Sequence, residues 1–173
     1  MTATGPLPDL SDQERRLIVL VAAGASHDQI SADHEAAVDP GSVRSAIELL
    51  LAKTRTRTVL QLAAWASAHR IVTSPVHPSA ALTIKPQLPP RLLQILQGWA
   101  AGRSTPELTA DWGIAPSTMR TYTKTLLTQL GVDSQLQASV VGVLAGLTRL
   151  NDIEPAWPAD PRGHDVEQHR RAP

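Results

Sequence analysis

The sequence predicts an all-α fold made of two tandem four-helix domains joined by a proline-containing linker. Apolar residues recur at helical spacing through residues 10–70 and again through residues 88–150. Ser-x-x-Glu patterns and glycines stand where such helices would begin and end. Because the second tract repeats the order of these signals in the first, the chain is expected to contain an internal repeat.

The first tract, residues 10–70, contains four predicted helices. Ser11 with Glu14 three residues later is typical of a capping box, and Gly24 stands where the first helix should end. The expected helices cover Ser11–Ala23, Ser26–His34, Pro40–Ala52 and Thr58–His69.

The second tract, residues 88–150, contains four more predicted helices in the same order. Ser104 with Glu107 repeats the capping-box pattern, and Gly102 and Gly131 mark two helix ends. The expected helices cover Pro90–Ala101, Ser104–Trp112, Pro116–Leu130 and Ser134–Leu147.

Three segments lie outside these tracts. Residues 1–9 are expected to be disordered, and residues 71–87 to form the linker, since prolines stand there among small residues. Residues 151–173 are expected to form a flexible tail, because they combine several prolines and mixed charges with almost no apolar pattern.

The composition excludes several classes of function. The chain has no cysteine, which excludes disulfides and thiolate metal sites and fits a reducing cytoplasm. It shows no signal peptide, and no apolar run approaches the roughly 18 residues of a membrane span. The histidines are scattered and no nucleophile motif frames a serine, so no metal, no cofactor and no enzymatic activity are expected.

Residues 88–150 carry a pattern that resembles the LuxR-type (GerE-like) helix-turn-helix domain. The matching features are Leu88, Ala100-Ala101-Gly102, Ser104, Glu107-Leu108, Ile114, Ser117-Thr118-Met119-Arg120 and Leu130-Gly131-Val132. Residues 10–70 resemble a divergent copy, which needs an insertion and a deletion and lacks the Leu-Gly-Val element. The resemblance implies a sequence-specific DNA-binding transcriptional regulator whose third helix enters the major groove.

The third helix of the second tract has one apolar and one polar face. At about 100° per residue, Met119, Leu126 and Leu130 share the core face. The opposite face carries two cations and three hydroxyls without an acid: Ser117, Arg120, Thr121, Lys124 and Thr128. Arginine and lysine reach guanine or phosphate, and threonine offers its hydroxyl to phosphate or its methyl group to thymine. The resemblance implies base contacts by Arg120, Thr121 and Lys124, and phosphate contacts by Ser104, Thr105 and Thr118.

The corresponding helix of the first tract is less suited to DNA. Its outer face holds Arg44 and Ser45 as candidate DNA contacts, together with Glu48, Leu49 and Ala52. Glu48 stands at the position of Lys124 and would be repelled by phosphates unless it accepts from a cytosine amino group. Glu48 and Leu49 instead favour contact with a protein partner, and a degenerate structural copy is the other interpretation.

Both fourth helices are apolar all round, so each must be buried on two sides. One side packs on its own domain and the other needs a partner. Two arrangements satisfy this requirement: a homodimer between chains, or an intramolecular pseudo-dimer in which the two fourth helices pair.

Net charge is zero, which argues against DNA binding, yet its distribution is uneven. Residues 85–150 carry six lysines and arginines against three acids, whereas residues 1–70 carry seven against eight. The leading hypothesis is therefore a cytoplasmic, nucleoid-associated regulator that binds double-stranded DNA through its second domain. The alternative is a helix-turn-helix scaffold that binds another regulator or an assembly partner.

Overall fold

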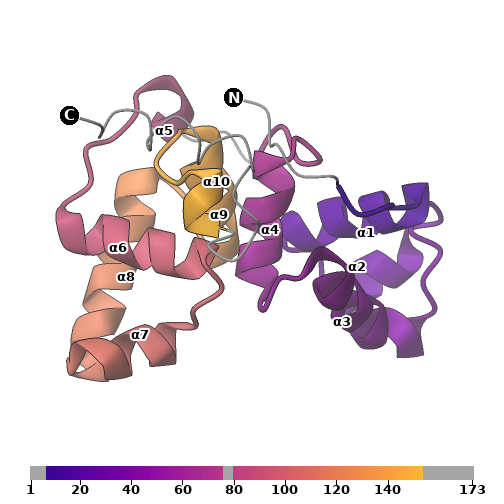
Figure 1. The fold of residues 1–173 in the computed structure, drawn as a ribbon, viewed down its shortest axis with the longest axis horizontal. Coiled ribbons are helices and arrows are strands. Elements are labelled where there is room, and N and C mark those ends of the chain that lie inside the picture. Colours follow the sequence, from indigo (N-terminus) through magenta and orange to yellow (C-terminus); the bar gives the residue numbers. More distant parts are fainter. Residues whose placement is uncertain (1–6, 76–79, 154–173) are drawn as a thin grey trace, which may run out of the picture.

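The computed structural model describes residues 7–75 and 80–153, and every regular element in these ranges is helical (Figure 1). The prediction of an all-α chain is confirmed. The first group of helices comprises α1 (Asp12–Ala22), α2 (His27–Ala32), the 3-10 helix η1 (Pro40–Ser42), α3 (Val43–Thr54) and α4 (Val59–Ala68). After α5 (Ala80–Thr83) come α6 (Pro90–Ala100), α7 (Thr105–Trp112), α8 (Pro116–Leu130), α9 (Gln135–Leu144) and α10 (Leu150–Ile153).

The helix starts are built as the local sequence predicts. Both expected capping boxes form, at Ser11 with Glu14 and at Ser104 with Glu107. A third box joins Ser26 and Gln29 at the start of α2. Its Ser-x-x-Gln pattern belongs to the same class of signal but was not used in the prediction.

Helices α4 and α9 pack against each other at the centre of the molecule, with α1–α3 on one side and α6–α8 on the other (Figure 1). Seven consecutive residues of α4, from Gln61 to Ser67, are buried, as are residues 138–142 of α9. This contact within one chain covers the second face that each of these apolar helices must bury.

The hydrophobic core runs across this contact rather than stopping at it. The cluster around Trp65 and Leu62 of α4 also contains Ala100 of α6 and Val140 of α9. The cluster around Trp99 and Leu126 in turn has Leu60 of α4 packed against it. The two groups of helices therefore share buried surface, as the predicted intramolecular pairing of the fourth helices requires.

Polar contacts tie the same surfaces together. The buried side-chain amide of Gln61 donates from Nε2 to the Ile153 carbonyl (2.8 Å) and accepts from the Arg57 backbone N–H (2.7 Å). Gly102 lies against this amide with φ +83°, and a Cβ there would come within 2.3 Å of Gln61 Oε1. Only glycine combines that backbone conformation with so close an approach.

The structure differs from the sequence prediction at two connecting segments. The predicted linker, residues 71–87, contains the short helix α5, and Lys85 Nζ donates to the Gly146 carbonyl (2.7 Å). The predicted flexible tail begins instead as part of α10, whose Ile153 is fully buried because it packs against α4 and α6. One buried isoleucine after a turn is too short a pattern to detect. The predicted disorder of residues 1–6 and the rest of the tail, residues 154–173, lie outside the described residues.

No helix in the described ranges has both the length and the apolar character needed to cross a bilayer.

Candidate nucleic-acid interface

Helices α7 and α8 and the turn between them form a helix-turn-helix. Helix α7 ends at Gly113, whose left-handed backbone (φ +59°) turns the chain within a few residues into α8. Pro116 occupies the first turn of α8, where its missing N–H leaves no hydrogen bond unmade. Gly131, again left-handed, ends the helix.

The inner side of α8 is anchored as predicted. Met119, Leu126 and Leu130 are buried, with Tyr122 and Leu127 half-buried beside them. This stripe determines which side of the helix faces solvent.

The outer side of α8 presents the predicted polar residues. Ser117, Arg120, Thr121, Lys124 and Thr128 are all exposed. Neither Arg120 nor Lys124 forms a hydrogen bond or an ion pair with any residue in ranges 7–75 and 80–153. Both cations are therefore available to a ligand without first breaking an internal contact.

The threonine hydroxyls on this face donate to their own helix. Thr121 Oγ1 donates to the Ser117 carbonyl (3.1 Å) and Thr128 Oγ1 to the Lys124 carbonyl (2.9 Å). Thr125, which is also exposed and was not predicted, donates to the Thr121 carbonyl. These hydroxyls can accept a hydrogen bond from a ligand, but their protons are already used. A methyl contact to thymine fits this arrangement better than donation to a phosphate.

The predicted phosphate contacts differ in their surroundings. Ser104 is occupied by the capping box, since its hydroxyl accepts from Glu107 N–H and its backbone N–H donates to Glu107 Oε2 (2.6 Å). The Thr105 hydroxyl accepts from Trp99 Nε1 (3.0 Å) and Gln135 Nε2 (3.3 Å), which leaves its own proton for an outside acceptor. Thr118 is half-buried.

Three neighbouring cations are already engaged. Arg91 lies 4.9 Å from the centre of the Trp112 ring, Arg103 pairs with Asp111, and Lys85 bonds to a backbone carbonyl. The unpartnered positive charge of α8 thus resides on Arg120 and Lys124.

Glu107 joins the helix-turn-helix to the first group of helices. Its carboxylate accepts from the Ser104 backbone, and Arg57 Nη2 lies 3.1 Å from its other oxygen. Hydrogen bonds from the Ser104 backbone and side chain, followed by the Arg57 guanidinium, lower the pKa of Glu107 from 4.5 to about 2. The carboxylate is therefore charged at neutral pH and holds the start of α7.

Helix α3 presents a different surface. Arg44 Nε lies 3.0 Å from Glu48 Oε1, so the candidate DNA-contacting cation is paired within its own helix. Ser45 is exposed, and Leu49 beside it is 71% exposed. The candidates Arg44 and Ser45 thus lie on a different helix, outside the α7–α8 unit.

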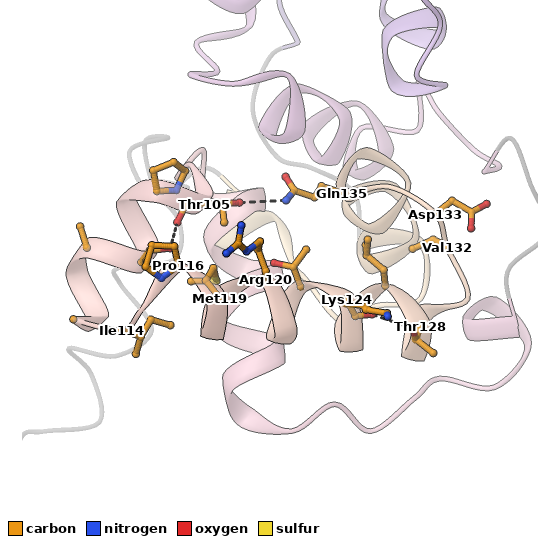
Figure 2. Close-up of a pocket in the computed structure, with 16 residues that line it drawn as sticks. Thr105, Ile114, Pro116, Met119, Arg120, Lys124, Thr128, Val132, Asp133 and Gln135 are labelled. Carbon is orange, nitrogen blue, oxygen red and sulfur yellow. Dashed lines mark hydrogen bonds between the residues drawn. The ribbon is translucent and has the colours of Figure 1, made fainter.

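A groove of about 890 Å³ runs between α7, α8 and the start of α9 (Figure 2). It brings together four predicted site residues, Thr105, Arg120, Lys124 and Thr128, with Gln135. Ser104, Ser117, Thr118 and Thr121 do not line it. The sequence contains no signal for this groove, because its shape depends on how far α7 and α8 stand apart.

Comparison with known proteins identifies the helix-turn-helix. Residues 86–141, which include α6, α7, α8 and most of α9, match the family described as bacterial regulatory proteins, luxR family (GerE). This segment is a LuxR-type helix-turn-helix domain, the DNA-binding domain of a class of regulators. The match does not extend to residues 10–70, so a divergent second copy there stays a prediction. Neither the curated proteins nor the solved structures gave a match.

Proposed function

We propose that this protein is a transcriptional regulator that reads a specific DNA sequence with α8. In this proposal Arg120 and Lys124 contact base edges or adjacent phosphates, and Thr121 contacts a base through its methyl group. Thr105 donates its hydroxyl proton to a phosphate at the start of α7, where the helix dipole also favours an anion. Thr118, Ser117 and Thr128 flank the contact that α8 makes with the DNA.

The observation that carries the proposal is the state of the two α8 cations within a LuxR-type domain. Arg120 and Lys124 are exposed, unpaired and one helical turn apart on a face that carries no acid.

A single chain is the proposed binding unit. Because α4 and α9 cover each other within the chain, the apolar surface that would drive a homodimer through the fourth helices is already buried. The protein is accordingly proposed to bind one asymmetric site rather than a palindrome.

The experiment is a selection from random genomic fragments at fixed salt, followed by footprinting, with the solution mass measured in parallel. We expect enrichment of a discrete sequence and the mass of one chain. Equal retention of all fragments, or no retention, would remove sequence-specific DNA binding from the proposal.

A second candidate function has its own supporting observation. On α3 the Arg44–Glu48 pair has no net charge and adjoins the exposed Leu49, which suits a protein surface better than phosphates. In this version α3 recruits another regulator while α8 holds the DNA. Leu49→Gln, which adds no charge, would then abolish partner capture and leave DNA affinity unchanged.

A further inference from the structure

The groove between α7 and α8 has an apolar interior. Ile114, Met119, Leu127 and Val132 all line it, and its volume of about 890 Å³ lies in the range of small-molecule sites. A DNA backbone contacts mainly the polar rim of such a groove, because phosphates and sugars are recognised through hydrogen bonds.

One buried polar atom in this groove lacks a partner. The Thr123 hydroxyl is buried and forms no hydrogen bond with the part of the chain that the structure describes, although Thr123 lines the groove. The hydroxyls of Thr121, Thr125 and Thr128 on the same helix instead donate to carbonyls of α8. A buried hydroxyl without a partner is unfavourable, and a rotation of the Thr123 side chain about χ1 would present it to an acceptor atom in the groove.

The charged residues of the lining are unevenly distributed. Arg120 and Lys124 lie on either side of Thr123 in the same stripe of α8, and neither is paired. Asp133, the acid of the lining, follows the end of α8 beyond Gly131. Figure 2 shows Arg120 and Lys124 projecting from α8, with Asp133 set apart near the loop before α9. The groove therefore favours an anionic group near Arg120 and Lys124 and an apolar group over its apolar lining.

From this arrangement we propose that the groove binds a small amphiphilic carboxylate. Its carboxylate lies among Arg120, Thr123 and Lys124, and its alkyl or aryl body covers the partly exposed Leu127 and Val132. Because Arg120 and Lys124 are also the proposed DNA contacts, the bound carboxylate displaces DNA. This regulatory consequence rests on the proposed function, whereas binding of the carboxylate itself does not.

The test uses the full chain and sodium decanoate below its micellar concentration, with binding measured by calorimetry in the absence of DNA. Decyltrimethylammonium, with the same chain length and the opposite charge, is the control ligand. We expect saturable binding of decanoate at one site and at least about tenfold weaker binding of the cation.

Two variants locate the site. Thr123→Met fills the groove and removes the unpartnered hydroxyl, and is expected to weaken decanoate binding by about tenfold or more. Thr123→Val keeps the volume of the side chain and is expected to weaken decanoate binding only a few-fold. Ala110→Met on the exposed wall contributed by α7 fills the same space from the other side if Thr123→Met fails to fold.

Competition is then measured on the selected DNA. Decanoate should release DNA from the wild-type chain and not from Thr123→Met. Three results would overturn the site. Decanoate could bind the filled variants as tightly as the wild type, both ligands could bind equally, or binding could occur only at micellar concentrations. Decanoate binding without DNA binding would contradict the proposed function alone, and decanoate binding without DNA release would overturn the competition.

Discussion

Helices α8 and α3 occupy the same place in the predicted repeat, yet they present opposite surfaces. On α8 the exposed face has two unpaired cations and a row of hydroxyls. On α3 both exposed cations are paired, Arg44 with Glu48 and Lys53 with Glu14, and Leu49 projects beside Glu48. A single exchange, lysine at 124 against glutamate at 48, accounts for most of the electrostatic difference.

The turns around α3 and α8 also differ, in the residues that hold their backbone. The turn before α8 and the end of α8 use glycines in the left-handed conformation, Gly113 and Gly131. The turn before α3 is held by Asp33, which accepts from the backbone of Glu35 and Ala36 and pairs with Arg16 (2.7 Å), and α3 ends at a left-handed Arg55. A non-glycine residue there is strained by about 1 kcal/mol or more. The two tracts of the predicted repeat thus differ in the local chemistry that holds their turns, and the helical pattern alone does not specify a DNA-binding surface.

The largest expected effect tests whether the two groups of helices are separable. Trp65 is fully buried where α4 meets the rest of the core. We expect Trp65→Ala to lower the free energy of unfolding by about 3–5 kcal/mol, because it leaves a large cavity. Denaturant unfolding should show one transition by both circular dichroism and tryptophan fluorescence.

The matched control for this variant is Leu49→Ala, an exposed position where the change should stay within about 0.5 kcal/mol. Two resolved transitions in Trp65→Ala, with α6–α9 unaffected, would show that the groups fold independently.

The second prediction compares α8 with α3 on DNA. Arg120→Ala and Lys124→Ala should each weaken specific binding by about 1–3 kcal/mol, because each removes a charged contact to a base or phosphate. Arg44→Ala, which removes an already paired cation, should change affinity by less than about 0.5 kcal/mol. Titration of the selected site by fluorescence anisotropy measures all three. Wild-type affinity in both α8 variants would remove the assignment of this helix.

The third prediction contrasts the two capping-box glutamates. The pKa of Glu14 is lowered, first by a hydrogen bond from Lys53 and then by one from the Ser11 backbone. The pKa of Glu107 is lowered to about 2, chiefly by hydrogen bonds with Ser104. A lowered carboxylate pKa stabilises the folded chain above the ordinary pKa of 4.5 and loses that effect as the pH falls towards 2. The difference in unfolding free energy between wild type and Glu107→Gln should therefore be constant near pH 7 and shrink between about pH 4.5 and 2.

Glu14→Gln is the comparison for this measurement and should show the same sign. Because Glu107 pairs with Arg57 across the two groups of helices, Arg57→Gln should reduce the pH dependence assigned to Glu107. A gap between wild type and Glu107→Gln that does not change from pH 7 to pH 2 would contradict the lowered pKa.

The smallest expected effect comes from a variant that gives α3 the charge pattern of α8. Glu48→Lys replaces an exposed ion pair by two like charges four residues apart, which should destabilise the chain by about 0.5–1 kcal/mol. It should also strengthen non-specific DNA binding and steepen the salt dependence by about 0.9 in the log–log slope if the new cation meets a phosphate. Glu48→Gln separates loss of the pair from gain of the charge. An unchanged slope would place α3 away from DNA.

Much of the secondary structure could be predicted because its signals are local. Ser11, Ser104, Gly102 and Gly131 mark helix ends within a few residues, and the core stripe of α8 follows from helical periodicity alone. The outward position of Arg120 and Lys124 followed from the same periodicity. Periodicity could not predict that these two cations lack internal ion pairs, since Arg103 in the same domain pairs with an acid eight positions away.

Local pattern was sufficient for the helices, their buried stripes and the demand that two all-apolar helices be covered, because each depends on neighbours within a few turns. Only the packed chain decided that α4 and α9 cover each other, that Ile153 and Gln61 meet across the core, and that α7 and α8 stand far enough apart to leave a groove. These outcomes depend on how rigid side chains of distant segments fit together, and close packing makes that fit a property of the whole chain.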